Sequence, residues 1–155
     1  MSIKLNKKPR PDDLTAKMPL RLEKGGDIYK DKQGVEGFVE FWSEDATAIK
    51  ANMTRIGARL TRLEAIRGRR TDEQWRAMTD DAIANENEEY KMLSVEALAI
   101  RSKSWYLVDS EGEAQDVAHT MENARDLFGD DEFRAVALDW LKDNKSAFLQ
   151  MKSEG

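Results

Sequence analysis

The segment Ser43–Gln74, SEDATAIKANMTRIGARLTRLEAIRGRRTDEQ, decides the fold class of this chain. A series of its apolar residues recurs at steps of three or four, which is the spacing of one face of an α-helix. Ser43 is a good N-cap, and Gly68 suits the left-handed position that ends many helices. The pattern therefore predicts one long helix over residues 43–68, whose buried face carries Ala46, Ile49, Met53, Ile56, Leu60, Leu63 and Ile66.

A second helix is expected to begin at Thr71, because Thr71 and Gln74 have the spacing of a capping box. Its apolar pattern weakens over residues 85–89, which marks a kink or a portion outside the core, and resumes up to Ile100. A connection of about four residues forces two such helices into an antiparallel hairpin.

Two short apolar runs lie upstream, at residues 27–29 and 35–42, on either side of the turn sequence DKQG at residues 31–34. This arrangement predicts a small N-terminal β-hairpin. Its second strand has large side chains on both faces, so it is either buried between helices or keeps one face for a partner.

The first 24 residues hold seven lysines and arginines, three acidic residues and all three prolines. They predict a flexible basic N-terminal arm over residues 1–24, which enters a strand near Met18–Leu22. A length of 155 residues fits one domain, which we expect at residues 25–150, followed by a C-terminal tail at residues 151–155.

The C-terminal third of the chain changes its periodicity twice. Residues 105–108 predict a short strand that ends in a turn at residues 109–112. Thr120 then caps a short helix that stops at Gly129, and a last helix runs over residues 131–149. The expected fold is mainly α (α+β): an antiparallel helical hairpin and C-terminal helices, with a small N-terminal β-hairpin.

The composition excludes several kinds of site. The chain has no cysteine and a single histidine, His119, which excludes disulfides, thiolate zinc sites and multi-histidine metal sites. It has no phosphate-binding glycine loop, and its 30 acidic residues make any carboxylate pair uninformative. We therefore expect no enzymatic activity, no catalytic residue and no cofactor. The lack of a long apolar run or a secretory pattern predicts a cytoplasmic protein without a membrane span.

Residues 55–70 form the most basic part of the chain, with six arginines and one glutamate. Such a stripe can neutralise phosphates, so a nucleic-acid-associated regulator that uses Arg55–Arg70 is one alternative. In the expected hairpin, however, three of the arginines face the region of Asp80 and Asp81, and pairing within the fold is the stronger interpretation. These three are Arg55, Arg59 and Arg62.

From Trp105 onward the chain combines three short motifs: WYLVDSEG at residues 105–112, ENARDLF at 122–128 and DNKSAFL at 143–149. Together they resemble the tail assembly chaperones of long-tailed bacteriophages and related prophages. In that family a tryptophan precedes a turn that ends in glycine, and a helix beginning E-N-A and a terminal helix follow. Residues 34–42 are also similar to the family's N-terminal part. Residues 113–121, EAQDVAHTM, depart from the apolar–Phe–Ser approach to the helix that is usual there.

The resemblance implies a protein without a reaction of its own. Chaperones of this family bind the tape-measure protein before the tail tube polymerises, recruit tail tube subunits, and are absent from the mature virion. A set of apolar side chains near the C-terminal helices is the candidate partner-binding surface, unless these residues form the core instead. The set comprises Trp105, Phe128, Phe133, Trp140 and Phe148.

Two further alternatives stay open. The near-heptad seam of residues 46–66 can serve self-association of the chain, unless the second helix already covers it. A structural component of the phage head or tail is the other alternative to a chaperone.

Overall fold

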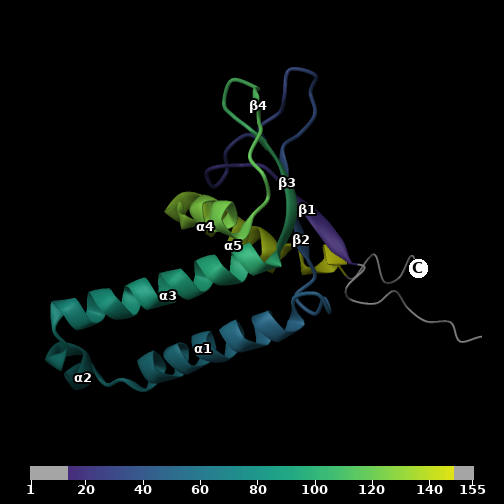
Figure 1. The fold of residues 1–155 in the computed structure, drawn as a ribbon. Helices are drawn as coiled ribbons and strands as arrows, with labels where there is room; N and C mark the ends of the chain where they lie inside the picture. The colour runs from purple at the N-terminus through teal and green to yellow at the C-terminus, as the bar shows by residue number, and fades with distance from the viewer. Residues whose placement is uncertain (1–13, 149–155) are drawn as a thin grey trace, which may run out of the picture.

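The computed structural model describes residues 14–148, which form a small sheet, a long helical hairpin and two C-terminal helices (Figure 1). Of these described residues, 55% are in helices and 16% are in strands, so the fold class is α+β with helix dominant. In chain order the elements are β1 (Thr15–Pro19), β2 (Phe38–Trp42), α1 (Lys50–Arg69), α2 (Asp72–Ala77), α3 (Asp80–Arg101), β3 (Ser102–Val108), β4 (Ala114–Gln115), α4 (Met121–Gly129) and α5 (Asp131–Asp143).

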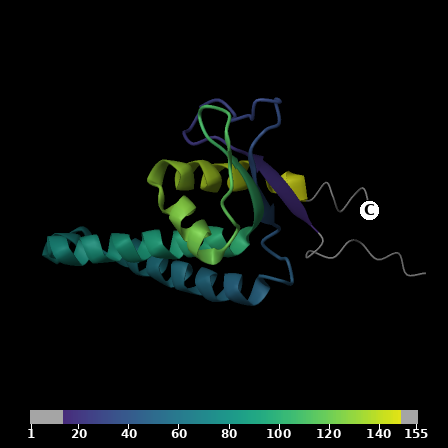
Figure 2. The ribbon, with the colours of Figure 1, turned by 45° about the horizontal axis from the view of Figure 1, so that its top comes forward.

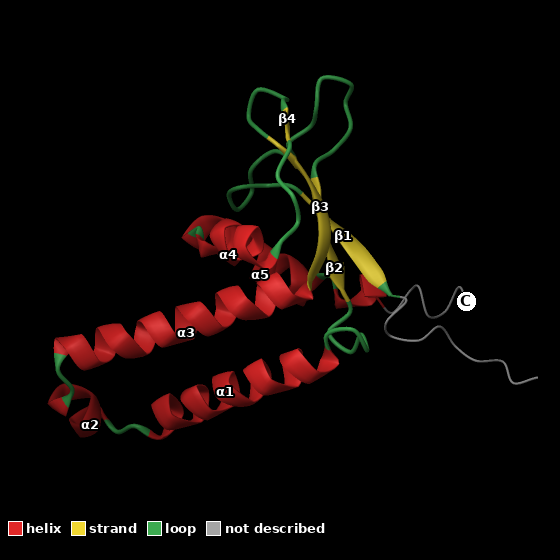
Figure 3. Cartoon of the chain, viewed as in Figure 1, coloured by secondary structure: helices red, strands yellow, loops and turns green. Residues whose placement is uncertain are grey.

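The four strands form one antiparallel sheet in the order β1-β2-β3-β4 (Figure 3). Successive side chains of a strand point to opposite faces. Val39 and Phe41 of β2 are fully buried, whereas Phe38, Glu40 and Trp42 on the other face are half-buried. The sheet therefore has one core face, and large side chains also occupy its second face.

The expected N-terminal β-hairpin is wrong, because residues 27–29 are not the strand that pairs with β2. Its turn forms, because the Asp31 carboxylate accepts hydrogen bonds from the backbone N–H groups of Gln33 and Val35 (both 2.9 Å), but only an isolated bridge follows it. β2 pairs with β1 instead. That pairing brings Met18 into the core, whereas residues 27–29 are exposed or half-buried.

The segment that contains β1 belongs to the core. Leu14, Met18 and Leu20 are at most 2% exposed, because alternate residues of this extended segment face the interior. Burial of a leucine or methionine side chain contributes about 1.5–3 kcal/mol, which is enough to hold the segment in place.

The expected chain organisation needs correction at this point. A flexible arm over residues 1–24 is wrong for residues 14–20, and the strand expected near Met18–Leu22 lies three residues earlier. Residues 1–13 of the expected arm and the expected tail at 151–155 lie outside the described residues.

The main core lies between the sheet and the helices α3, α4 and α5 (Figure 2). Its centre is a group of aromatic rings. The ring centroid of Phe41 lies 5.9 Å from that of Phe128 and 6.4 Å from that of Trp140, and Phe128 stacks on Phe133 at 5.7 Å. Aromatic pairs at these separations add to the stabilisation that burial of their area already gives.

Helices α1 and α3 lie side by side and run in opposite directions, with α2 at the far end (Figure 1). Ile56 and Leu63 of α1 and Leu93 of α3 form a second, smaller core between them. We call α1, α2 and the first half of α3 the helical arm, because this part projects from the rest of the molecule (Figure 2).

The start and end expected for the first helix are wrong. Helix α1 begins at Lys50, because the backbone N–H of Ser43 still donates to the carbonyl of Leu14 and extends the pairing of the sheet. Gly68 does not cap the helix. Its φ is not positive, and the helix continues to Arg69.

The second helix is divided where no break was expected. The capping box of Thr71 and Gln74 is confirmed, with both reciprocal hydrogen bonds formed (2.9 and 3.2 Å). Helix α2 nevertheless ends at Ala77, because the Thr79 hydroxyl accepts from the N–H of Ala82 and starts a new helix. Of the two alternatives for residues 85–89, a portion outside the core is confirmed and a kink is not, since α3 is continuous there and these residues are exposed or half-buried.

The C-terminal elements follow the expected order. The Asp109 carboxylate closes the turn that ends at Gly112, and the Thr120 hydroxyl caps α4 as predicted. The last helix differs, because α5 ends at Asp143 and Asn144 interrupts it. No helix in residues 14–148 has the length and apolar character needed to cross a membrane.

Candidate partner-binding surface

The five residues predicted to bind a partner lie close together, but as part of the core. Phe128, Phe133 and Phe148 are at most 5% exposed, and Trp105 and Trp140 are half-buried and pack against the same cluster. Their clustering in the sequence therefore reflects their burial against the sheet. The alternative that these residues form the core is confirmed for the three phenylalanines, and the expected partner-binding surface is wrong for Phe128 and Phe133, which are at most 1% exposed. Phe148 also lines a cavity beside Arg101.

The two tryptophans are also engaged within the fold. Trp105 donates its indole N–H to the carbonyl of Val117 (2.8 Å) and meets the His119 ring edge-on at 4.6 Å. Trp140 stacks on Phe41. Both side chains hold neighbouring segments in place.

A groove between α3 and α5 offers exposed apolar side chains instead. Tyr90 of α3 is 38% exposed and Leu138 of α5 is 44% exposed. Polar and small side chains of α3 form the rest of that wall: Ala84, Asn87, Glu88, Lys91 and Ser94. We call this feature the α3–α5 groove. An open depression between two helices, with exposed apolar side chains among polar ones, is the kind of site that can receive an amphipathic helix.

Charged residues fix one end of the α3–α5 groove. Asp131, the first residue of α5, accepts hydrogen bonds from Arg134 (2.7 Å) and Lys91 (3.3 Å). These bonds hold the pKa of Asp131 below its usual value, so the carboxylate stays ionised. Arg134 also donates to the carbonyls of Phe128 and Gly129 at the end of α4. The groove therefore combines apolar side chains with an ordered polar end.

The spacing of apolar residues in α5 indicates that Leu138 is exposed. In α5 the buried residues Phe133, Ala137 and Leu141 recur every four positions, and Leu138 falls outside that series. Tyr90 carries no such signal, because its position continues the apolar seam of the second helix.

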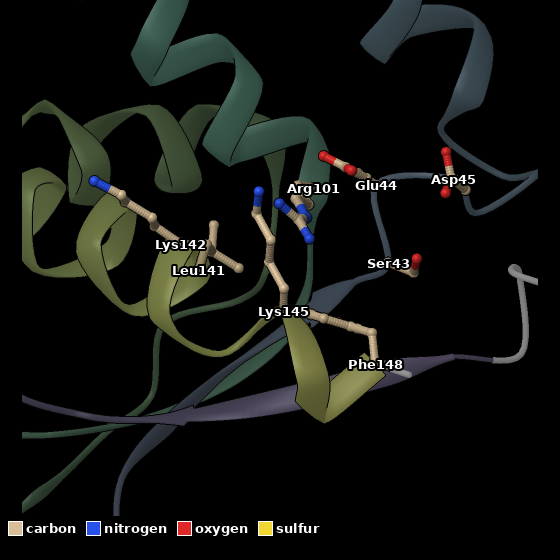
Figure 4. A pocket seen from close by; sticks show the side chains of 8 residues that line it. All are labelled: Ser43, Glu44, Asp45, Arg101, Leu141, Lys142, Lys145 and Phe148. Atoms are coloured by element: carbon tan, nitrogen blue, oxygen red, sulfur yellow. The ribbon is translucent and has the colours of Figure 1, made fainter. Parts of the chain in front are cut away.

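A cavity of about 250 Å³ lies beside Arg101 at the end of α3 (Figure 4). Arg101 donates to the carbonyl of Trp42 (2.8 Å), and its guanidinium lies 5.2 Å from the ring centroid of Phe148. Burial lowers the pKa of Arg101, while the nearby carboxylates of Glu44 and Asp45 act in the opposite direction. Arg101 thus connects the sheet, α3 and the last turn of helix, which is a structural role.

Ser102 and His119 form a pair that sequence analysis did not identify. The Ser102 hydroxyl lies 2.9 Å from Nε2 of His119 and donates to the carbonyl of Ala99 (2.7 Å). Ser102 is 4% exposed, and burial lowers the pKa of His119. A serine whose proton is directed to a carbonyl is not activated by the imidazole, and it has no access to substrate. The pair instead anchors the segment before α4.

The arginines of α1 pair differently from the prediction. Arg70 makes a two-pronged contact with Glu86 (3.0 and 2.8 Å), and Arg67 lies 3.1 Å from the same carboxylate. The hydrogen bonds from Arg70 lower the pKa of Glu86. The predicted pairing of Arg55, Arg59 and Arg62 with Asp80 and Asp81 is wrong, because α2 lengthens the connection and shifts the register of the two helices.

Within residues 14–148 no group of three or more histidine, aspartate or glutamate side chains could hold a metal ion. Comparisons with protein-family models, with curated proteins and with solved structures found no match to this chain.

Proposed function

We propose that the protein is a tail assembly chaperone of a long-tailed phage, which binds apolar helices of the tape-measure protein in the α3–α5 groove. It acts in the cytoplasm of the host cell, recruits tail tube subunits to the complex and catalyses no reaction. It leaves the assembly before the virion is complete.

The observation that carries this proposal is the pair of exposed apolar side chains in the groove, Tyr90 and Leu138. A tape-measure helix is apolar along one face and would aggregate if that face remained in water. The groove can cover such a face, and its ordered ion cluster at Asp131 can orient the polar side of the helix.

The motifs that resemble the family support the proposal through their local geometry. The Asp109 carboxylate closes the turn of the WYLVDSEG motif, with Gly112 at a φ of +81°. The ENARDLF motif forms α4, whose Ala124 and Phe128 are fully buried. Both motifs therefore have structural duties that a family would share across its members.

The test is co-expression with a helical segment of the tape-measure protein encoded beside this chain. The double variant Tyr90→Asp, Leu138→Asp is expected to reduce the soluble, co-purified segment by roughly tenfold or more, because it replaces the two large apolar side chains of the groove with charged ones. Val117→Asp changes an exposed valine outside the groove and is the matched control. Equal capture by the folded double variant would contradict the proposal.

A nucleic-acid-associated regulator is the second candidate, because Arg55, Arg59, Arg62 and Arg69 make no ion pair among residues 14–148. Such a protein would bind duplex DNA at low salt and lose affinity steeply as salt rises. Lack of binding at low salt would eliminate this candidate. A structural component of the virion is distinguished by the presence of the chain in purified particles.

A further inference from the structure

Most of the surface of helix α1 in the helical arm is not buried by the rest of the fold. In the described part of the chain, α1 makes extensive contact with α3 alone. Only Ile56 and Leu63 of its 20 residues are buried, and the arm projects away from the sheet (Figure 1). The outer face of α1 is therefore available to a partner over its whole length.

One stripe of this face carries most of its charge. Arg55, Arg59, Arg62, Ile66 and Arg69 follow one another at steps of four and three, so they lie on one side of the helix over about 21 Å. All five are exposed. We call these five residues the arginine stripe.

The described residues use little of the positive charge of the stripe: Arg55 only adds to the stronger effect of Arg125 in lowering the pKa of Glu96. Arg67, on the neighbouring face of α1, and Arg70, just after the end of the helix, bind Glu86. The four arginines of the stripe make no ion pair with any residue between 14 and 148, and Arg55 donates only to its neighbour Asn52 (3.3 Å). Like charges at this spacing repel one another, and an acidic partner would remove that repulsion.

The stripe ends at an apolar hollow on the tip of the arm. Ile66 is 49% exposed, and together with Met78 and the stem of Arg69 it lines a shallow depression between α1 and α2. A depression of this kind accepts a single apolar side chain, which would give a docked helix a defined register.

From these two features we infer that the outer face of α1 docks an acidic amphipathic helix of a partner protein. The carboxylates of the partner lie along the arginine stripe, and one of its apolar side chains enters the hollow between Ile66 and Met78. Nucleic acid fits less well. The exposed Asp80 and Asp81 on the same arm repel phosphates, and an apolar hollow forms no favourable contact with a phosphate backbone.

The probe is a labelled synthetic peptide of about 21 residues, helical and rich in alanine, with glutamates at steps of three and four and one terminal leucine. Its anisotropy is measured with the full chain at about 50 mM salt, where surface charges are weakly screened. A peptide with lysines in place of the glutamates and a DNA duplex of about 20 base pairs are measured in parallel.

The acidic peptide is expected to bind, and Arg59→Glu together with Arg62→Glu should weaken its binding by roughly tenfold or more. Ile66→Asp should weaken it several-fold through the hollow. Lys50→Glu is the matched control, because it changes a lysine on the opposite side of the same helix and should leave the affinity within about twofold. All four positions are exposed, so circular dichroism should show unchanged folding.

Failure of the acidic peptide to bind would overturn the inference, as would equal affinity for the variant that lacks Arg59 and Arg62. Tighter binding of the duplex than of the acidic peptide would also overturn it, in favour of nucleic acid. The inference does not depend on the α3–α5 groove, since Leu138→Asp should leave the affinity for the acidic peptide unchanged.

Discussion

The sheet with its covering helices and the helical arm are stabilised in different ways. The main core seals large rings such as Phe41, Phe128 and Phe133 between a sheet and three helices. The arm has only the small core of Ile56, Leu63 and Leu93, supplemented by ion pairs at Glu86. The difference indicates that the first region fixes the fold, while the second presents surface and can open without unfolding the rest.

Truncation of a ring in the main core should have the largest effect. Phe128→Ala removes a fully buried side chain that contacts two other rings, and we expect a loss of about 3–5 kcal/mol in the free energy of unfolding. Urea unfolding followed by circular dichroism measures it. A loss below about 1 kcal/mol would mean that these rings are not packed as described.

The arm should respond less to the same kind of change. Leu63→Ala is expected to lose about 2 kcal/mol, at the low end for a buried leucine, because its small core can partly collapse. Hydrogen exchange should accelerate in α1 and in the first half of α3, while β2 and α4 stay protected. Equal acceleration in both regions would show that they unfold as one unit.

The turn at Gly112 lies in the sheet region but contributes through its backbone. Gly112 has a φ of +81°, and a Cβ at this position would come within 3.3 Å of the Lys30 carbonyl. Gly112→Ala should therefore destabilise the protein by about 1 kcal/mol. Gly34→Ala should destabilise it less, because a Cβ there meets the same unfavourable positive φ but no neighbouring atom within 4 Å. Thermal unfolding of the two variants separates the contact from the conformational effect.

The smallest effect is expected from the ion pairs of the arm, and it depends on pH. The pKa of Glu86 is lowered by Arg70 in the folded state, so the pair stabilises the arm above the ordinary glutamate pKa of about 4.5 and loses this effect as pH falls. Glu86→Gln should unfold more easily than the natural chain at pH 7, and the difference should shrink as pH falls through the lowered pKa of Glu86 in the folded state. A difference that persists in acid would contradict this role.

Three local signals in the sequence predicted local structure correctly, whereas the caps expected at Ser43 and Gly68 were wrong. The capping box at Thr71, the cap at Thr120 and the glycine turn at Gly112 each need only neighbouring residues to form, and each is present. The α+β class also followed from the change of periodicity along the chain. These features do not depend on which distant segments meet.

Features that depend on distant segments were predicted less well. The pairing of β2 with β1 depends on burial of Met18, and the late start of α1 depends on a hydrogen bond between Ser43 and Leu14. The break between α2 and α3 arises because Thr71 and Thr79 both cap helices, and this shifts every pair between the two long helices.

The candidate site shows the same limit. Periodicity cannot distinguish a ring that packs on a sheet from one that binds a partner, so the sequence leaves both roles open for Phe128, Phe133 and Phe148, and the structure places them in the core. The exposed pair in the groove, Tyr90 and Leu138, comes from helices that the sequence does not bring together. Only the packing of α5 near α3 reveals it.

Hydrogen exchange of the chain, alone and in complex with the co-expressed tape-measure segment, tests the central claim most directly. Binding in the α3–α5 groove predicts slower exchange at residues 84–94 and 131–138, with unchanged exchange in the sheet. Protection confined to the sheet, or no protection in a complex that does form, would contradict the assignment of the groove as the binding site.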